Sequence, residues 1–155
     1  MIENESIQLL ETKAQDLPQI IEIEKKYVQF VGQYNLAQHK KVTTNQNEKH
    51  LSVFNKSDNA LIGYVILAGI LNKNRVIEFR RIALLKRGLG YGKPIVKLIK
   101  EICFKQYKAN KVWLDVYTDN ERAIRLYVKE GFVKEKRVKQ PNKNGRSVYM
   151  MSITK

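Results

Sequence analysis

The feature of the sequence that most constrains its fold is a change of pattern on either side of a glycine-rich turn. Residues 76–84 favour a strand, whereas apolar residues between positions 95 and 107 recur at helical spacing. Glycines at positions 88, 90 and 92 separate the two patterns, and alternation typical of a strand returns at residues 111–117. A strand, a helix and a strand in series predict a parallel crossover.

Short turns elsewhere predict antiparallel pairing. Asn-rich turns separate the three strands before the crossover, which are therefore expected to form a meander. The turn at residues 141–145 predicts a hairpin after the crossover. The result is a mixed sheet with helices packed against it. The expected strands are residues 51–54, 61–70, 76–84, 111–117, 132–139 and 147–153.

Helices are expected on both sides of the meander and after the crossover. Apolar residues recur at helical spacing from Leu17 to Phe30, with Asp16 as N-cap. A helix from Asn120 to Glu130 should end at Gly131, because glycine readily adopts the left-handed conformation that closes helices. Residues 34–47 are ambiguous between a short helix and a loop.

Size and composition favour one domain spanning residues 1–155. Of these residues 43% are hydrophobic, which is enough for a core, and no repeat or linker marks a boundary. The lone Cys103 lies on an apolar helix stripe and is expected in the core, and no Cys/His spacing suggests a metal site. The N-terminus lacks signal-peptide regions and residues 60–71 are too short to span a bilayer, so we expect a cytoplasmic protein without a membrane partner.

The net charge of +14 raises an alternative function. Residues 1–34 carry six acidic and three basic side chains, so the positive charge resides in residues 35–155. A basic RNA- or ribosome-associated binding module without catalysis would use such a surface. The sequence has no aromatic RNA-binding motif, helix-turn-helix pattern or zinc site, which argues against nucleic acid as the partner.

The turn Arg87-Gly88-Leu89-Gly90-Tyr91-Gly92-Lys93 is suited to an anion. Glycines allow successive backbone N–H groups to point inward, and the start of the following helix adds unpaired donors. A pyrophosphate would fit such a turn, although ordinary turns also use glycines. The spacing matches neither a P-loop nor a dinucleotide-binding fingerprint.

With these residues the sequence resembles the GCN5-related N-acetyltransferase (GNAT) superfamily. Arg87, Gly90 and Gly92 match the family signature Gln/Arg-x-x-Gly-x-Gly/Ala, and Asn120, Tyr127 and Gly131-Phe132 follow in the family's order. The resemblance implies an α/β (α+β) fold: a mixed, mostly antiparallel sheet of six or seven strands, helices on both faces and a splayed central parallel pair. The link from Leu84 to Arg87 is shorter than is usual in the family.

The resemblance also implies that acetyl-CoA is the co-substrate. Its pyrophosphate would be held by the glycine turn, and its pantetheine arm would pair with the backbone of the preceding strand. The expected coenzyme-binding residues are Ile82, Ala83, Leu84, Arg87, Gly88, Leu89, Gly90, Tyr91, Gly92, Lys93, Asn120 and Tyr127. Asn120 could instead lie in the first helical turn, where Thr118 and Glu121 have capping-box spacing.

Two residues are candidates for catalysis. Tyr127 corresponds to the family's general acid for the thiolate, although its spacing also fits simple helix packing. Glu78 is the candidate base, because it shares a strand face with Leu84 if no bulge intervenes. A structural ion pair with Arg80, or ordered water as the base, are the alternatives. His39 and His50 are isolated in the sequence and suggest surface or supporting roles.

The expected activity is transfer of an acetyl group from acetyl-CoA to a primary amine by direct transfer in a ternary complex. The acceptor would be an amine of a small molecule or a protein N-terminus. Glu22 and Glu24 weakly favour a cationic amine, whereas the basic surface opposes it. A second copy of the chain, forming a homodimer, is another expected partner.

Overall fold

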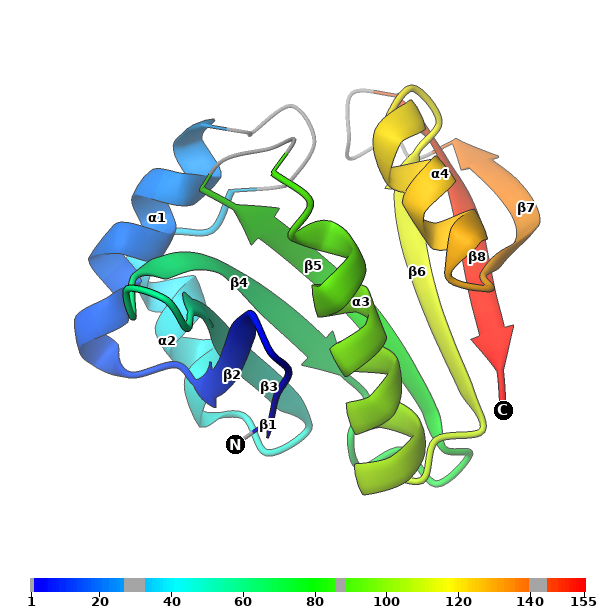
Figure 1. Ribbon diagram of the computed structural model, residues 1–155. Coiled ribbons are helices and arrows are strands. Elements are labelled where there is room, and N and C mark those ends of the chain that lie inside the picture. Colours follow the sequence, from blue (N-terminus) through cyan, green and yellow to red (C-terminus); the bar gives the residue numbers. More distant parts are fainter. Residues whose placement is uncertain (1, 27–32, 86–88, 140–144) are drawn as a thin grey trace.

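The computed structural model describes residues 2–26, 33–85, 89–139 and 145–155 (Figure 1). Within these residues a single mixed sheet runs in the order β1-β2-β3-β4-β5-β6-β8-β7. Its neighbouring strands are antiparallel except for β5 and β6, which are parallel. The strands are β1 (Ile2–Glu3), β2 (Ile7–Glu11), β3 (Glu48–Asn55), β4 (Leu61–Ala68), β5 (Val76–Leu84), β6 (Lys111–Tyr117), β7 (Val133–Lys139) and β8 (Ser147–Thr154).

Helices cover both faces of this sheet. On one face, α1 (Leu17–Lys26) and α2 (Leu36–Thr44) share a core cluster with residues of β4 and β5. On the other face, α3 (Gly92–Glu101) and α4 (Glu121–Lys129) contribute to a larger cluster with most of the strands. The predicted mixed sheet with helices on both faces is therefore confirmed, as are the meander and the parallel crossover through α3.

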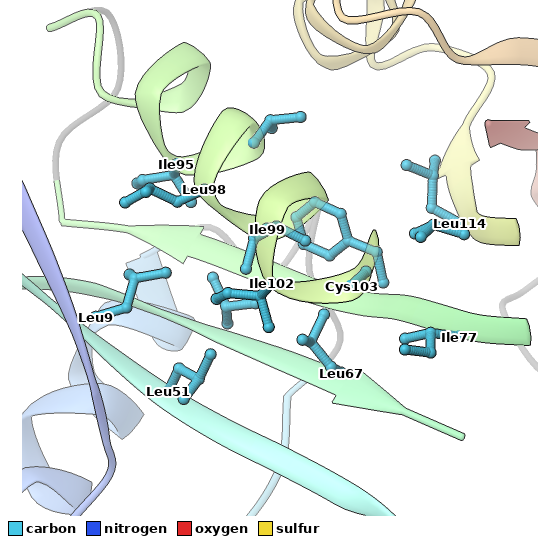
Figure 2. Packing of buried hydrophobic residues seen from close by; sticks show 14 of the residues in the cluster. Leu9, Leu51, Leu67, Ile77, Ile95, Leu98, Ile99, Ile102, Cys103 and Leu114 are labelled. Atoms are coloured by element: carbon cyan, nitrogen blue, oxygen red, sulfur yellow. The ribbon is translucent and has the colours of Figure 1, made fainter. Parts of the chain in front are cut away.

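The side chains of α3 pack directly onto the sheet. Ile95 and Leu98 point from α3 toward the side of the sheet that carries Leu9, and Leu67 belongs to the same cluster (Figure 2). A π-helical turn, Ile102–Gln106, extends α3 and places Cys103 in the same core. Cys103 is fully buried, as expected, and burial raises the pKa of its thiol to about 12.

The central parallel pair is very short. β5 and β6 are paired only at Val76–Lys111, Ile77–Val112 and Glu78–Trp113. Beyond these pairs the two strands diverge (Figure 1). The splayed pair implied by the family resemblance is therefore present, and its apex lies at Glu78 and Trp113.

A β-bulge interrupts β5 just beyond this apex. Ile66 of β4 is opposite Arg81, whereas the next residue, Leu67, is opposite Phe79, so that Arg80 is inserted between paired positions. The bulge changes which side chains share a face. Ile77, Phe79, Ile82 and Leu84 contribute to the cluster beneath α3, whereas Ala83 packs under α1 and α2.

The boundaries of several elements differ from the predictions. The sheet has eight strands in the described residues, because Ile7–Glu11 forms β2 and pairs with β1. Asp16 does not cap α1; it ends a 3-10 turn whose N-cap is Lys13. The ambiguous segment contains α2, which Asn35 caps through a hydrogen bond from the Gln38 N–H.

The last strand in the sheet order, β7, lies at an exposed edge. Six of its seven residues are exposed and Val138 is half-buried. Four of the exposed side chains are basic: Lys134, Lys136, Arg137 and Lys139. No helix in the described part of the chain is long and apolar enough to cross a membrane.

Replacement of Gly63 on β4 by alanine tests how closely β4 and β5 approach each other. A Cβ atom at this position would lie 2.4 Å from the Ala83 carbonyl oxygen, so Gly63→Ala should lower the free energy of unfolding by about 1–3 kcal/mol. Urea denaturation measures this change. Ser57→Ala, in the exposed turn before β4, is the control and should shift stability by less than about 0.5 kcal/mol. Equal stability of the two variants would contradict the close approach.

Candidate active site

The glycine turn leads directly into the N-terminus of α3. Gly90 has a φ of +79°, which favours glycine, and a Cβ there would meet no atom within 4 Å. The backbone at Gly90 therefore faces open space. Gly92 is constrained differently, because its Cβ would lie 2.9 Å from Leu126 Cδ2 of α4.

The start of α3 is suited to bind an anion. Its N-cap, Tyr91, makes no side-chain capping hydrogen bond, and the first turn of α3 contains no acidic residue. Backbone N–H groups at a helix N-terminus attract negative charge, and Lys93 adds a cation. Leu89, Gly90 and Gly92 complete the described part of the turn. Arg87 and Gly88 lie outside the described residues.

The part of β5 beyond Glu78 presents its backbone edge toward the gap that opens where β6 diverges. Since pairing with β6 ends at Glu78, the later residues of β5 have no β6 partner in the described ladder. Ile82 and Leu84 are half-buried on the α3 side, whereas Ala83 is buried beneath α1 and α2. The arrangement leaves an extended segment against which an elongated ligand can lie as an added strand.

Tyr127 links α4 to both sides of the splay. Its ring centroid lies 6.1 Å from that of Phe79 on β5 and 5.7 Å from that of Phe132. The residue is 6% exposed, and burial raises the pKa of its phenol. The phenol therefore remains protonated at neutral pH, which is the state that a proton donor needs.

Glu78 lies at the apex of the splay, on the face covered by α1 and α2. It pairs across the ladder with Ala68, and its carboxylate accepts two hydrogen bonds of 3.1 Å from the Arg80 guanidinium. Arg80 also lies 3.5 Å from Glu48. The expectation that Glu78 shares a face with Leu84 is wrong, because the bulge at Arg80 reverses the alternation between them.

Asn120 caps α4. Its side-chain oxygen accepts a hydrogen bond of 3.4 Å from the Ala123 N–H, and the helix proper begins at Glu121. The alternative in which Thr118 begins a capping box and Asn120 lies in the first helical turn is not observed, because the N-cap is Asn120 itself. Asn120 thus stands at the start of the helix that carries Tyr127.

A buried polar network lies between α1, α2 and the sheet. Glu24 of α1 is fully buried, and its carboxylate accepts hydrogen bonds from His39 at 2.6 Å, Arg81 at 2.7 Å and the Tyr64 hydroxyl. His39 in turn contacts His50 at 3.0 Å. Burial by itself would raise the pKa of Glu24, but the hydrogen bonds from His39 and Tyr64 and the charge of Arg81 lower it.

Sequence reasoning missed this network. His39 is 0% and His50 is 3% exposed, so a surface position for either is wrong. The two histidines are eleven residues apart in the sequence, and only the packing of α2 against β3 brings them together. One signal was present: apolar Ile20 and Ile23 put Glu24 next to the buried stripe of α1. Among the described residues, no group of three His, Cys, Asp or Glu side chains is arranged to hold a metal ion.

Comparison with known proteins identifies the family. The model of the acetyltransferase (GNAT) family matches residues 16–132. The chain therefore belongs to the acetyltransferase (GNAT) family. This result confirms the resemblance inferred from Arg87, Gly90 and Gly92, and it covers the helices, the splayed strands and the glycine turn of the site described above.

Solved structures of other family members confirm the fold. Spermidine N-acetyltransferase SpeG from Vibrio cholerae in complex with CoA and spermine superposes with a TM-score of 0.84 at 21% identity, covering 97% of this chain and 96% of that chain. A mutant form of the same enzyme has a TM-score of 0.83 at 23% identity, with 97% and 95% covered. A dodecameric form has a TM-score of 0.82 at 22% identity, with 97% and 95% covered.

A curated relative shares a shorter segment. The kanamycin resistance protein of Rhizobium radiobacter is 36% identical over 64 residues, which is 41% of this chain and 57% of that protein. The chain thus spans little more than half the length of this relative.

The buried His50 makes stability depend on pH. Burial and then the charge of His39 lower the pKa of His50 to about 3, whereas a histidine in the unfolded chain titrates near 6.5. The unfolded state therefore binds a proton that folded His50 does not. The contribution of His50 to stability should be complete above about pH 6.5, and it should fall toward pH 5 with a slope approaching about 1.4 kcal/mol per pH unit. Urea denaturation across this range measures the slope, and a flat profile would contradict a neutral His50.

Proposed function

We propose that the protein transfers an acetyl group from acetyl-CoA to a primary amine, by direct transfer in a ternary complex. The observation that carries this proposal is the splayed strand pair that leads through the glycine turn into the N-terminus of α3. An extended backbone edge and a cluster of helix N–H groups in series match an elongated ligand with a pyrophosphate at one end. Membership of the acetyltransferase family supports the same conclusion.

The proposed coenzyme site follows this path along the chain. The backbone around Ile82, Ala83 and Leu84 would bind the pantetheine arm, and an N–H near Leu84 would polarise the thioester carbonyl. The residues from Arg87 to Lys93, that is Arg87, Gly88, Leu89, Gly90, Tyr91, Gly92 and Lys93, would bind the pyrophosphate. The open space at Gly90 supports this position. Asn120 would contribute from the start of α4 in addition to its role as N-cap.

The reaction requires two proton transfers. The neutral amine nitrogen attacks the thioester carbonyl carbon, the C–S bond breaks, and the sulfur takes a proton. We assign the donation of this proton to Tyr127, whose buried phenol is protonated at neutral pH. The attacking nitrogen must lose one proton as the amide forms, and that proton passes to a base on the acceptor side.

Glu78 is the proposed base, and its ion pair with Arg80 defines how it would act. The two hydrogen bonds from Arg80 occupy Oε1 of Glu78, which leaves Oε2 to receive a proton directly or through water. The face that Glu78 shares with α1 and α2 is opposite to the face of Leu84. The amine would therefore approach from the α1 and α2 side, while the coenzyme would follow the β5 edge.

The acceptor is proposed to be a small molecule with a primary amine. The solved relative binds spermine and the curated relative is named for kanamycin resistance, and both ligands carry several amines. Glu24 cannot contribute to binding a cationic amine, because His39, Tyr64 and Arg81 already occupy its buried carboxylate. A protein N-terminus is the second acceptor class, and the panel below separates the two.

We further propose that residues 1–155 act as one domain in the cytoplasm and that copies of the chain associate. One continuous sheet joins the first and last described strands, which supports a single domain. A dodecameric relative supports self-association, without favouring a dimer over a larger assembly.

Acetyl-CoA binding and turnover test the proposed function. The coenzyme at 100 times a micromolar Kd should raise the thermal midpoint, since ligand binding to the folded state adds about 2.7 kcal/mol of stability. Thiol release is then measured with spermidine, spermine, kanamycin and a short peptide with a free N-terminus. Acetylation of any amine supports the proposal. Absence of both stabilisation and turnover, together with salt-sensitive RNA retention, would favour the binding module instead.

Replacement of Tyr127 tests the proton donor. Tyr127→Phe preserves the ring contacts with Phe79 and Phe132 but removes the hydroxyl, so kcat should fall by about 10²–10⁴-fold with little change in coenzyme affinity. Tyr107→Phe, at a half-buried tyrosine beyond α3, is the control and should retain the activity of the unmodified protein. An unchanged kcat in Tyr127→Phe would exclude the acid role.

A further inference from the structure

The buried network extends from Glu24 to Asp16 as one chain of hydrogen bonds. Glu24 contacts His39 at 2.6 Å, and His39 contacts His50 at 3.0 Å through its other ring nitrogen. His50 Nδ1 lies 2.8 Å from the Thr12 hydroxyl, which lies 2.8 Å from the Ser52 hydroxyl. Ser52 donates to Asp16 at 3.3 Å. The chain thus connects a fully buried carboxylate with a half-buried one.

Each contact in this chain needs one hydrogen, which limits the protonation states. Five contacts join the six groups, and both ends are carboxylates that only accept when ionised. Thr12 and Ser52 supply one hydrogen each, and two neutral histidines supply one each. While both carboxylates are ionised, four hydrogens cannot fill five contacts, so one histidine then carries a second proton.

The second proton belongs on His39. His39 lies between the Glu24 carboxylate and a nitrogen acceptor of His50, so that an imidazolium at this position donates from both nitrogens. All later donors then point the same way, from His50 to Thr12, from Thr12 to Ser52 and from Ser52 to Asp16. The low pKa of His50 agrees with a neutral ring at that position.

We propose that His39 is a buried imidazolium whose proton locks α1 and α2 onto the sheet and positions the β5 bulge. The lock is direct, because His39 on α2 holds Glu24 on α1, and Glu24 holds Arg81 at the bulge. Arg81 also stacks on Tyr34, with its guanidinium carbon 3.9 Å from the ring centroid. Since this bulge places Glu78 on the acceptor side, Glu24 and His39 are positioning residues; this consequence rests on the proposed function.

The groups that face His39 favour and limit this charge. Glu24 on α1 is the anion that pairs with His39. Arg81 on β5 is a second cation, and it binds the same carboxylate. His50 on β3 and Tyr64 on β4 are packed against the His39 ring, as is Tyr34 before α2, and all three are neutral. On α2 itself, Lys40 and Lys41 are exposed, whereas His39 is buried.

Loss of the proton would reorganise the chain in a defined way. His39 gives its Nδ1 hydrogen to His50, His50 gives its Nδ1 hydrogen to Thr12, Thr12 passes its own to Ser52, and Ser52 passes its own to Asp16. His39 is then neutral, Asp16 is protonated, and each intermediate group keeps one hydrogen. When solvent removes the proton from Asp16, four hydrogens remain for five contacts and one hydrogen bond is lost. The lock is therefore weaker at alkaline pH.

Nitrogen NMR of the protein without ligand tests the protonation state. The chain has only two histidines, which makes their ring nitrogens readily assigned. At pH 7 we expect hydrogen on both nitrogens of His39 and on one nitrogen of His50. A neutral His39, or the second proton on His50, would overturn the proposal. Because no coenzyme or acceptor is present, this result is independent of the proposed acetyl transfer.

Asp16→Asn tests the link between the far end of the chain and the lock. The variant removes the negative charge at the far end of the chain, so the doubly protonated form of His39 should be less favoured than in the unmodified protein. Hydrogen exchange of α2 and of the β5 bulge should accelerate at a correspondingly lower pH. Glu22→Gln is the control, because it removes the same charge from an exposed position paired with Lys25 and should leave both profiles unchanged. Identical profiles in the two variants would overturn the proposal.

Kinetics distinguish positioning from simple stabilisation. With an amine accepted in the panel, Asp16→Asn should raise the acceptor KM at alkaline pH, while the affinity for acetyl-CoA stays unchanged. An unaltered pH profile of KM would overturn the positioning role even if the NMR result held. If no panel amine is acetylated, the proposed function fails, whereas the NMR and hydrogen-exchange results still decide whether His39 forms the lock.

Discussion

The separation of β5 from β6 is the constraint on which the rest of the structure depends. Only three residue pairs join the strands, so the sheet consists of two halves that meet along a short seam. Side chains from α3 and α4 fill the space on one face, with Tyr127 and Phe79 in contact across the divergence. A backbone edge inside a sheet would otherwise be costly, because its N–H and C=O groups need partners. A ligand that pairs with this edge would satisfy them.

Much of the fold was predictable because the sequence expresses it locally. Val76–Leu84 was predicted with its observed bounds, and the crossover to Lys111–Tyr117 followed from the helical spacing between them. Local patterns did not reveal β1 and β2, because the partners of β2 in β3 are about forty residues or more away. The N-cap at Lys13 differed from the predicted Asp16, and Thr118 was an alternative to Asn120 at the start of α4, because several polar residues compete for each helix start.

The candidate site was predictable only where a motif carries the information. Gly90 has a positive φ, which favours the glycine found there, and Tyr127 lies on the helix that Asn120 caps, as their spacing implied. The face of Glu78 could not be derived, because a single inserted residue, Arg80, reverses the alternation and leaves no mark in the sequence. The network around His39 was equally hidden, since α1, α2, β3, β4 and β5 each contribute one or two polar residues to it.

The exposed edge strand β7 has a consequence for how copies of this chain can meet. Open strand edges tend to pair with one another and seed aggregation, and natural proteins discourage this with lysine. Two β7 edges brought together would oppose Lys134, Lys136, Arg137 and Lys139 to the same cations. The basic side chains of β7 therefore disfavour pairing of one β7 edge with another. An assembly of identical chains should accordingly use surfaces other than this edge.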